Sequence, residues 1–254
     1  MALSDELRAK TLLRFATHQR AWDAKPELRT LYAEWYRRVA AELPPVSVGP
    51  RIELGSGPGF AREFIPDLEL TDLVRAPWHD REVSAEDLPF DDRSIGALVL
   101  FDVLHHIPAP RRFFEEASRV LCPGGRVVLC EPYISPVSWP VNKLFHVEPV
   151  RMRVDPLAPA ATDGRDPFDA NQGIPTVLFI RERAAFERAF PTLAIRRIER
   201  LAGLSYPASG GFSRRRLLVG RPWTALYRLE SLLPERAFAL IGFRMLIVLE
   251  KVRS

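Results

Sequence analysis

The chain has 254 residues, of which 47% are hydrophobic, enough for one large domain, and its 27% charged residues leave no segment with the composition of a disordered tail. The formal net charge of +4 comes mainly from arginine, since only four lysines are present, and a high-GC genome explains that bias more simply than an anionic partner. Two cysteines make no disulfide framework, no apolar run is long enough to span a bilayer, and the acidic start "MALSDELRAK" is unlike a secretion signal. We therefore expect a cytoplasmic protein.

Residues 1–45 are expected to form a helical cap. Leu28, Tyr32, Trp35 and Val39 are spaced by four, three and four residues, which places them on one face of a helix. The following "LPPVSVGP" breaks the helical pattern.

From residue 46 onward the pattern changes to short apolar runs separated by helical segments. The runs predicted as strands are 51–54, 68–74, a weak one near Val83, 97–104, 126–133, 194–201 and 243–252. Helices are predicted from Pro110 to the Gly124–Gly125 pair and over 181–190, while about 135–176 is expected to be irregular. Buried strands alternating with helices favour a doubly wound α/β domain over residues 46–254, with a mostly parallel sheet.

The segment "ELGSGPG", residues 53–59, places three glycines directly after the first predicted strand. A phosphate-binding P-loop would need Gly-Lys-Ser/Thr here, and a dinucleotide fingerprint would need Gly or Ala where the chain has Phe60. Glu53 would repel a pyrophosphate but suits an ammonium or sulfonium, and Asp72 is placed to accept both hydroxyls of a ribose. The loop therefore fits a cationic amino-acid nucleoside, and an NAD-dependent oxidoreductase is a less favoured alternative.

Several ordered motifs resemble those of class I S-adenosylmethionine-dependent methyltransferases, in the branch that acts on small molecules and lipid-tailed substrates. They are "ELGSGPG", Asp72, "AEDLPF" (85–90), "VLHHIP" (103–108), "RVLCPGG" (119–125) and "EP" (131–132). The match covers roughly residues 50–135. It implies a Rossmann-like, seven-stranded, mostly parallel sheet with an antiparallel last strand, and N-terminal helices folded over the cofactor.

The resemblance also implies which residues bind S-adenosylmethionine, with Glu53 near its amino group, Asp72 at the ribose and Phe101 beside the methyl donor. The full predicted set is Glu53, Leu54, Gly55, Ser56, Gly57, Gly59, Asp72, Leu73, Ser84, Ala85, Glu86 and Phe101. Ser84 departs from the family, which often has Asp there. Only "RAPWHDRE" (75–82) separates the second and third strands, so we expect a loop in place of the usual crossover helix.

Methyl transfer from a sulfonium requires alignment and exclusion of water, and an O- or N-nucleophile can also require a base. His105 is a candidate general base or substrate ligand, whereas a structural role is favoured for His106. Glu131 is a second candidate base, or a carboxylate satisfied by nearby backbone. No metal is expected.

The C-terminal third interleaves arginines with bulky apolar residues, among them Phe212, Arg214, Arg215, Arg216, Leu217, Leu218, Trp223 and Tyr227. One interpretation is a surface helix in weak peripheral contact with an anionic membrane. The favoured interpretation is a helix that packs on the sheet with its arginines in water.

The leading hypothesis is an S-adenosylmethionine-dependent methyltransferase for a small-molecule or lipid-linked acceptor. Nucleic acid is disfavoured as a substrate, because the residues after the fourth strand do not resemble those of base-methylating DNA enzymes. The alternative is a non-catalytic S-adenosylmethionine-binding or regulatory protein with the same fold. The sequence does not indicate the oligomeric state.

Overall fold

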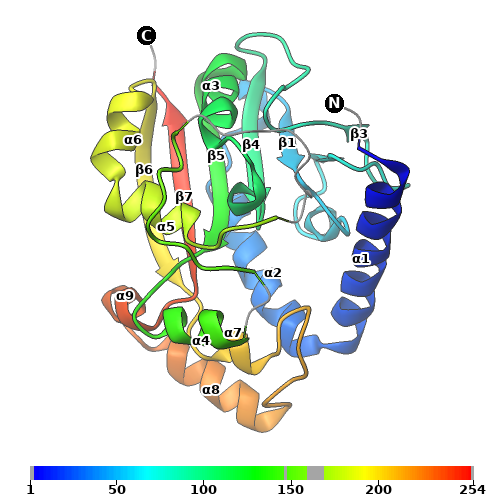
Figure 1. Cartoon of the computed structure of the whole chain (residues 1–254), viewed down its shortest axis with the longest axis vertical. Helices are drawn as coiled ribbons and strands as arrows, with labels where there is room; N and C mark the ends of the chain where they lie inside the picture. Colours follow the sequence, from blue (N-terminus) through cyan, green and yellow to red (C-terminus); the bar gives the residue numbers. More distant parts are fainter. Residues whose placement is uncertain (1–2, 146–147, 159–168, 253–254) are drawn as a thin grey trace.

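A computed structural model of the protein describes residues 3–145, 148–158 and 169–252 (Figure 1). Its sheet has the strand order β3-β2-β1-β4-β5-β7-β6, and β7 runs antiparallel to both of its neighbours while the other pairs are parallel. The strands are β1 (Arg51–Leu54), β2 (Leu68–Asp72), β3 (Arg81–Glu82), β4 (Ile95–Phe101), β5 (Leu121–Pro132), β6 (Leu193–Leu201) and β7 (Arg244–Lys251). The predicted seven-stranded sheet with an antiparallel last strand is confirmed.

Helices cover both faces of this sheet, as Figure 1 shows. Two long N-terminal helices come first, α1 (Asp5–Ala24) and α2 (Pro26–Ala41), and α3 (Pro110–Val120) and α6 (Arg183–Ala189) follow. Short helices complete the chain: α4 (Ser138–Phe145), α5 (Ile174–Thr176), α7 (Ser205–Ala208), α8 (Arg221–Ser231) and α9 (Phe238–Ile241). None of these helices, within the described ranges, is both long and apolar enough to cross a bilayer.

Two hydrophobic cores lie on the two faces of the sheet because successive strand side chains point to opposite sides. Leu98 and Leu100 of β4 pack in the core that contains α3 and α6, whereas Val99 and Phe101 pack in the core that contains α2. The stripe predicted for the N-terminal helix, from Leu28 to Val39, is buried there. The boundary near residue 45 stays a prediction.

The connection between β2 and β3 contains no helix, as expected from its length. The stretch 135–176, expected to be irregular, contains α4 and α5, and its residues 146–147 and 159–168 lie outside the described residues.

Candidate active site

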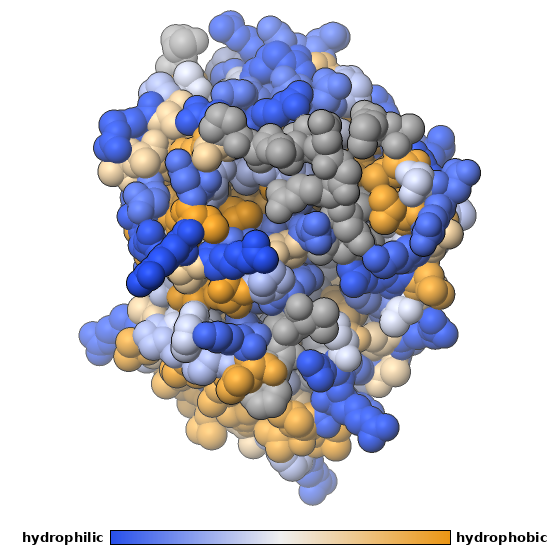
Figure 2. Space-filling model, in the orientation of Figure 1, coloured by the Kyte–Doolittle hydropathy of each residue, from blue (hydrophilic) through white to orange (hydrophobic). Residues whose placement is uncertain are grey.

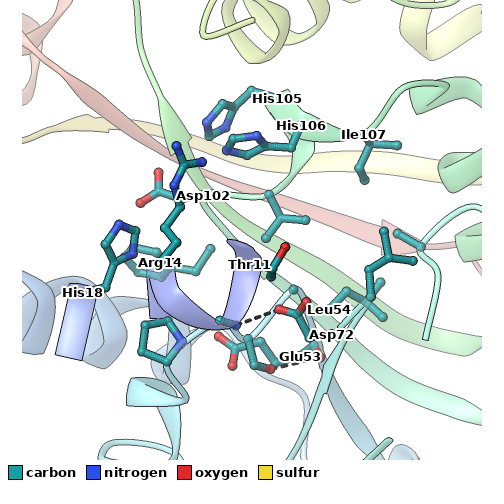
Figure 3. A pocket seen from close by; sticks show the side chains of 18 of the residues that line it. Thr11, Arg14, His18, Glu53, Leu54, Asp72, Asp102, His105, His106 and Ile107 are labelled. Carbon is teal, nitrogen blue, oxygen red and sulfur yellow. Dashed lines mark hydrogen bonds between the residues drawn. The ribbon is translucent and has the colours of Figure 1, made fainter. Parts of the chain in front are cut away.

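A cavity of about 650 Å³ lies at the carboxyl ends of β1, β2 and β4. This is the point at which the strand order reverses, where open α/β sheets bind their ligands. Helix α1 crosses the cavity and contributes Thr11, Arg14, Phe15 and His18 to its lining. Figure 3 shows Glu53 and Asp72 at one end and His105 and His106 at the other.

The three glycines of the 53–59 loop all have positive φ, at 70° for Gly55, 49° for Gly57 and 80° for Gly59. A Cβ on Gly55 would lie 2.6 Å from Val103, and one on Gly59 would lie 2.7 Å from Trp78, so both glycines are required by close packing within the protein. A Cβ on Gly57 would meet only Phe15, at 3.7 Å. Gly57 is therefore the glycine of the three that leaves open space beside the cavity.

The short β2–β3 connection holds the glycine loop in place. Trp78 donates its indole N–H to the carbonyl oxygen of Gly57 at 2.8 Å. His79 accepts the Ala76 amide at Nδ1, so its Nε2 carries the proton and donates to the same carbonyl at 2.7 Å. Trp78 and His79 were not among the residues predicted for the site, and their signal in the sequence was an indole and an imidazole in a connection too short for a helix.

Two buried carboxylates face the glycine-loop end of the cavity. Glu53 is 2% exposed, and its Oε2 has no hydrogen-bond partner within the described part of the chain. Burial raises the pKa of Glu53 to about 7. Asp72 accepts the amides of Gly57 at 2.9 Å and Val74 at 3.1 Å, and burial raises its pKa as well. An ammonium group fits Glu53, because it would supply the hydrogen bond and the positive charge that this carboxylate lacks.

Eleven of the twelve residues predicted to bind the donor line this cavity. The exception is Gly59, which does not line it and whose conformation serves the packing against Trp78. Ser84 Oγ accepts the Glu86 amide at 3.3 Å, and the Glu86 carboxylate accepts the Ala109 amide at 3.0 Å, so these two groups also order the chain around them. Their roles in binding stay predictions.

The imidazole of His105 lies between two carboxylates. Its Nδ1 is 2.7 Å from Glu131 Oε2, and its Nε2 is 3.4 Å from Glu148 Oε2. Burial lowers the pKa of His105, but the two carboxylates outweigh burial and raise it to about 10. The two carboxylates therefore favour the imidazolium form, which would not accept a proton from a substrate, and this makes His105 a weaker candidate for the general base.

Glu131 and His106 have different surroundings. The Oε1 of Glu131 accepts the amides of Val103 at 2.9 Å and Leu104 at 2.7 Å, which supports the interpretation of a carboxylate satisfied by backbone. Burial and the charge of His105 lower the pKa of His106 to about 3, so its ring is neutral in the cavity wall. The catalytic roles of His105, His106 and Glu131 stay predictions.

His105, His106 and Glu148 form the group that could hold a divalent cation among the described residues. One donor atom from each lies within 4.8 Å of the others. Two imidazoles and a carboxylate are a common donor set for transition metals. The expectation of a metal-free site stays a prediction, which chelation would test.

The far wall of the cavity combines aromatic rings with an ion pair between the buried Arg244 and the partly exposed Asp102. Arg244 lies 4.9 Å from the ring centroids of Trp35 and Tyr206, and it pairs with Asp102 through both carboxylate oxygens. Tyr32 donates its hydroxyl to Asp102 at 3.1 Å. Asp102 has φ 60°, an uncommon conformation for a residue other than glycine. The pair of Asp102 and Arg244 was not predicted, and its signal in the sequence was an arginine that interrupts the apolar run of the last strand.

Comparison with known proteins supports the predicted resemblance. Residues 60–129 match the family described as "Methyltransferase domain". A demethylmenaquinone methyltransferase of Clavibacter sepedonicus is 47% identical over 53 residues, which is 21% of this chain and 22% of that protein. The ubiquinone/menaquinone biosynthesis C-methyltransferase UbiE of Bartonella quintana is 38% identical over 86 residues, 32% of this chain and 30% of that protein. These alignments thus span less than a third of the relatives' own length.

The fold is similar to that of a chain from the complex between the Haloferax volcanii Trm112 methyltransferase activator and a methyltransferase. The two chains superpose with a TM-score of 0.50 at 15% identity, covering 99% of this chain and 100% of the other. That likeness concerns the fold alone. The fold similarity over the whole chain and the family match over residues 60–129 agree with the predicted resemblance to class I S-adenosylmethionine-dependent methyltransferases.

Proposed function

We propose that the protein transfers a methyl group from S-adenosylmethionine to a small acceptor with an apolar body. The observation that carries the proposal is the buried Glu53, which lines the cavity beside the glycine loop and has one carboxylate oxygen without a hydrogen-bond partner among the described residues. A buried carboxylate that lacks a cation has a large desolvation cost, and a ligand ammonium offsets that cost.

The cavity has a donor end and an acceptor end, and the donor end is lined by the glycine loop and the loops after β2 and β3. There, Glu53 would hold the amino group, Asp72 would hold the ribose hydroxyls, and Leu73 with residues 84–86 would border the adenine. S-adenosylmethionine supplies an activated methyl group, so the protein has to orient it and keep water away. Helix α1 covers this end, with Phe15 in edge contact with His79 at a centroid distance of 5.8 Å.

The acceptor end is lined by Tyr32, Phe101, Tyr206, Phe212 and Phe243. These rings suit a flat, apolar acceptor. The relatives named above are quinone-biosynthesis methyltransferases. We therefore propose a quinone-like ring with an apolar tail as the acceptor class, methylated without a strong base from His105.

The test is calorimetric titration of S-adenosylmethionine into the wild-type protein and the Asp72→Asn variant. A carboxylate that binds two ribose hydroxyls contributes a few kcal/mol, so we expect affinity to fall by about one to three orders of magnitude. Asp91→Asn is the matched control, because Asp91 is exposed and does not line the cavity. Absence of S-adenosylmethionine binding by the wild type would refute the proposal.

Turnover separates an enzyme from a regulatory binding protein. The wild type should convert demethylmenaquinone, the substrate in the relatives' names, to a product heavier by one methyl group, as read by mass spectrometry. Donor binding without turnover on any quinone tested would favour the non-catalytic alternative.

A further inference from the structure

Helix α8 carries apolar side chains on the face that it turns to water. Trp223 is buried, but Pro222, Ala225, Leu229 and Leu232 follow one another at spacings of three and four residues and are all exposed. Leu229 is 65% exposed and Leu232, at the C-cap, is 80% exposed. A surface helix normally has polar residues on this side, so α8 is apolar on its inner and its outer face.

Neighbouring segments extend this surface. Figure 2 shows apolar residues gathered in the lower part of the molecule, where Figure 1 places α4 and α8. An amide–carbonyl bond from Val137 to Leu240 joins the start of α4 to α9. We call this surface the lower face, and define it by the exposed residues Trp139, Leu144, Leu217, Val219, Leu229, Leu232, Leu233 and Leu240.

The lower face is flanked by positive charge. Residues 204–241 contain six arginines and only two glutamates, and one of these, Glu230, is buried and accepts hydrogen bonds from Ser205. Lys143 lies 4.8 Å from the ring centroid of Trp139 on α4. Exposed leucines and tryptophan beside arginine and lysine have the composition of surfaces that rest in the headgroup region of an anionic bilayer.

The lower face also adjoins the cavity. Asn142 of α4 lines the cavity, whereas Trp139 and Leu144 of the same helix face solvent. Phe212 and Ser213 line the cavity from the segment that continues into Arg214–Arg216 and the exposed Leu217. A bilayer at the lower face would therefore lie close to the acceptor end.

We propose that the lower face docks the protein on an anionic membrane surface, so that an acceptor with a lipid tail reaches the aromatic end of the cavity from the bilayer. The acceptor part of this inference rests on the proposed function. A second copy of the chain is a poorer occupant, because in a twofold contact the arginine-rich face would meet itself. Anionic lipid provides the charge of opposite sign.

Flotation of the full-length protein with vesicles tests the proposal. We expect the wild type to float with vesicles of equal parts phosphatidylcholine and phosphatidylglycerol at low salt, and to float far less with phosphatidylcholine alone. The double variant Leu229→Ser/Leu232→Ser should lower the partition coefficient by more than about tenfold, since two leucines no longer enter apolar surroundings. Arg221→Ser/Arg228→Ser should lower it by about fivefold per arginine.

Leu13→Ser is the matched control, because Leu13 is 64% exposed on α1 and lies outside the lower face. This variant should float like the wild type. A wild type that stays unbound with anionic vesicles would overturn the proposal, as would a Leu229→Ser/Leu232→Ser variant that floats unchanged. A dimer that these two substitutions dissociate, seen by sedimentation, would assign the face to a second copy instead. S-adenosylmethionine affinity, measured on the same samples without vesicles, reports on the proposed function separately.

Discussion

The two ends of the cavity are built in different ways. The proposed donor end is formed by the carboxyl-terminal parts of β1 and β2 and the loops that follow them, and Glu53, Gly57 and Asp72 lie within twenty residues of one another. At the acceptor end, Asp102 joins Tyr32, 70 residues away in sequence, and Arg244, 142 residues away. The donor end is thus a local structure, whereas the acceptor end exists only once the whole domain has folded.

Breaking the ion pair at the acceptor end should have the largest effect. Arg244→Met leaves Asp102 without its cation among aromatic rings, and we expect the free energy of unfolding to fall by about 3–5 kcal/mol in urea denaturation. The double variant Asp102→Asn/Arg244→Met should recover a large part of this loss, because no uncompensated charge then remains. Donor affinity of the folded single variant should stay near the wild-type value.

If Arg244→Met lowered the free energy of unfolding by less than about 1 kcal/mol, the ion pair would not organise the acceptor end. A large loss of donor affinity in the folded variant would show that the two ends are not independent.

His105 lies at the end of the cavity opposite Glu53 and Asp72 (Figure 3), and its pKa of about 10 predicts a stability change at alkaline pH. The folded protein holds this proton up to about pH 10, whereas an unfolded histidine releases it near pH 6.5. Its contribution to stability is therefore fully present below pH 6.5 and is lost as pH rises toward 10. Unfolding midpoints should fall across this window.

The His105→Asn variant should show a weaker decline over the same pH range. An imidazole that titrates near pH 6.5 in an NMR experiment on the wild type would contradict the assigned charge and restore His105 as a candidate base.

A smaller effect is expected at the donor end, where the affinity for S-adenosylmethionine should depend on pH through Glu53. Glu53 has a pKa of about 7 in the protein, raised by burial from 4.5, so the protonated carboxyl predominates below pH 7. A ligand ammonium prefers the carboxylate, so S-adenosylmethionine affinity should rise about tenfold between pH 5.5 and 7.0, as measured by calorimetry. In the Glu53→Gln variant this pH dependence of the affinity should disappear. If the affinity of the variant rose with pH as it does in the wild type, the amino group of the ligand would bind elsewhere.

Much of the fold and most of the donor end could be predicted from the sequence, because both depend on local patterns. Apolar runs predicted six of the seven strands, whereas β3 is the exposed pair Arg81–Glu82 beside the weak run predicted near Val83. The glycines of the 53–59 loop indicated the positive φ angles. The short β2–β3 connection was predicted, but its role was not, since nothing local shows that Trp78 and His79 reach the Gly57 carbonyl.

The acceptor end could not be predicted in the same way, because contacts between residues far apart in sequence depend on tertiary packing. In the sequence, Arg244 is only an interruption of an apolar strand. The structure shows that it pairs with Asp102 and that four aromatic rings surround its guanidinium group. His105 shows the same limit, since its charge depends on Glu131 and Glu148 from two other segments. The arginines and apolar residues of the C-terminal third were noted in the sequence, but only the fold shows that Leu229 and Leu232 face solvent.

The most direct test of a donor end at Glu53 and Asp72 is a crystal structure of the protein with S-adenosylhomocysteine. We expect the ligand's amino group within hydrogen-bond distance of the Glu53 carboxylate, and its ribose hydroxyls within hydrogen-bond distance of Asp72. A ligand bound among Tyr32, Tyr206 and Phe212 instead, with Glu53 still unpartnered, would contradict this expectation.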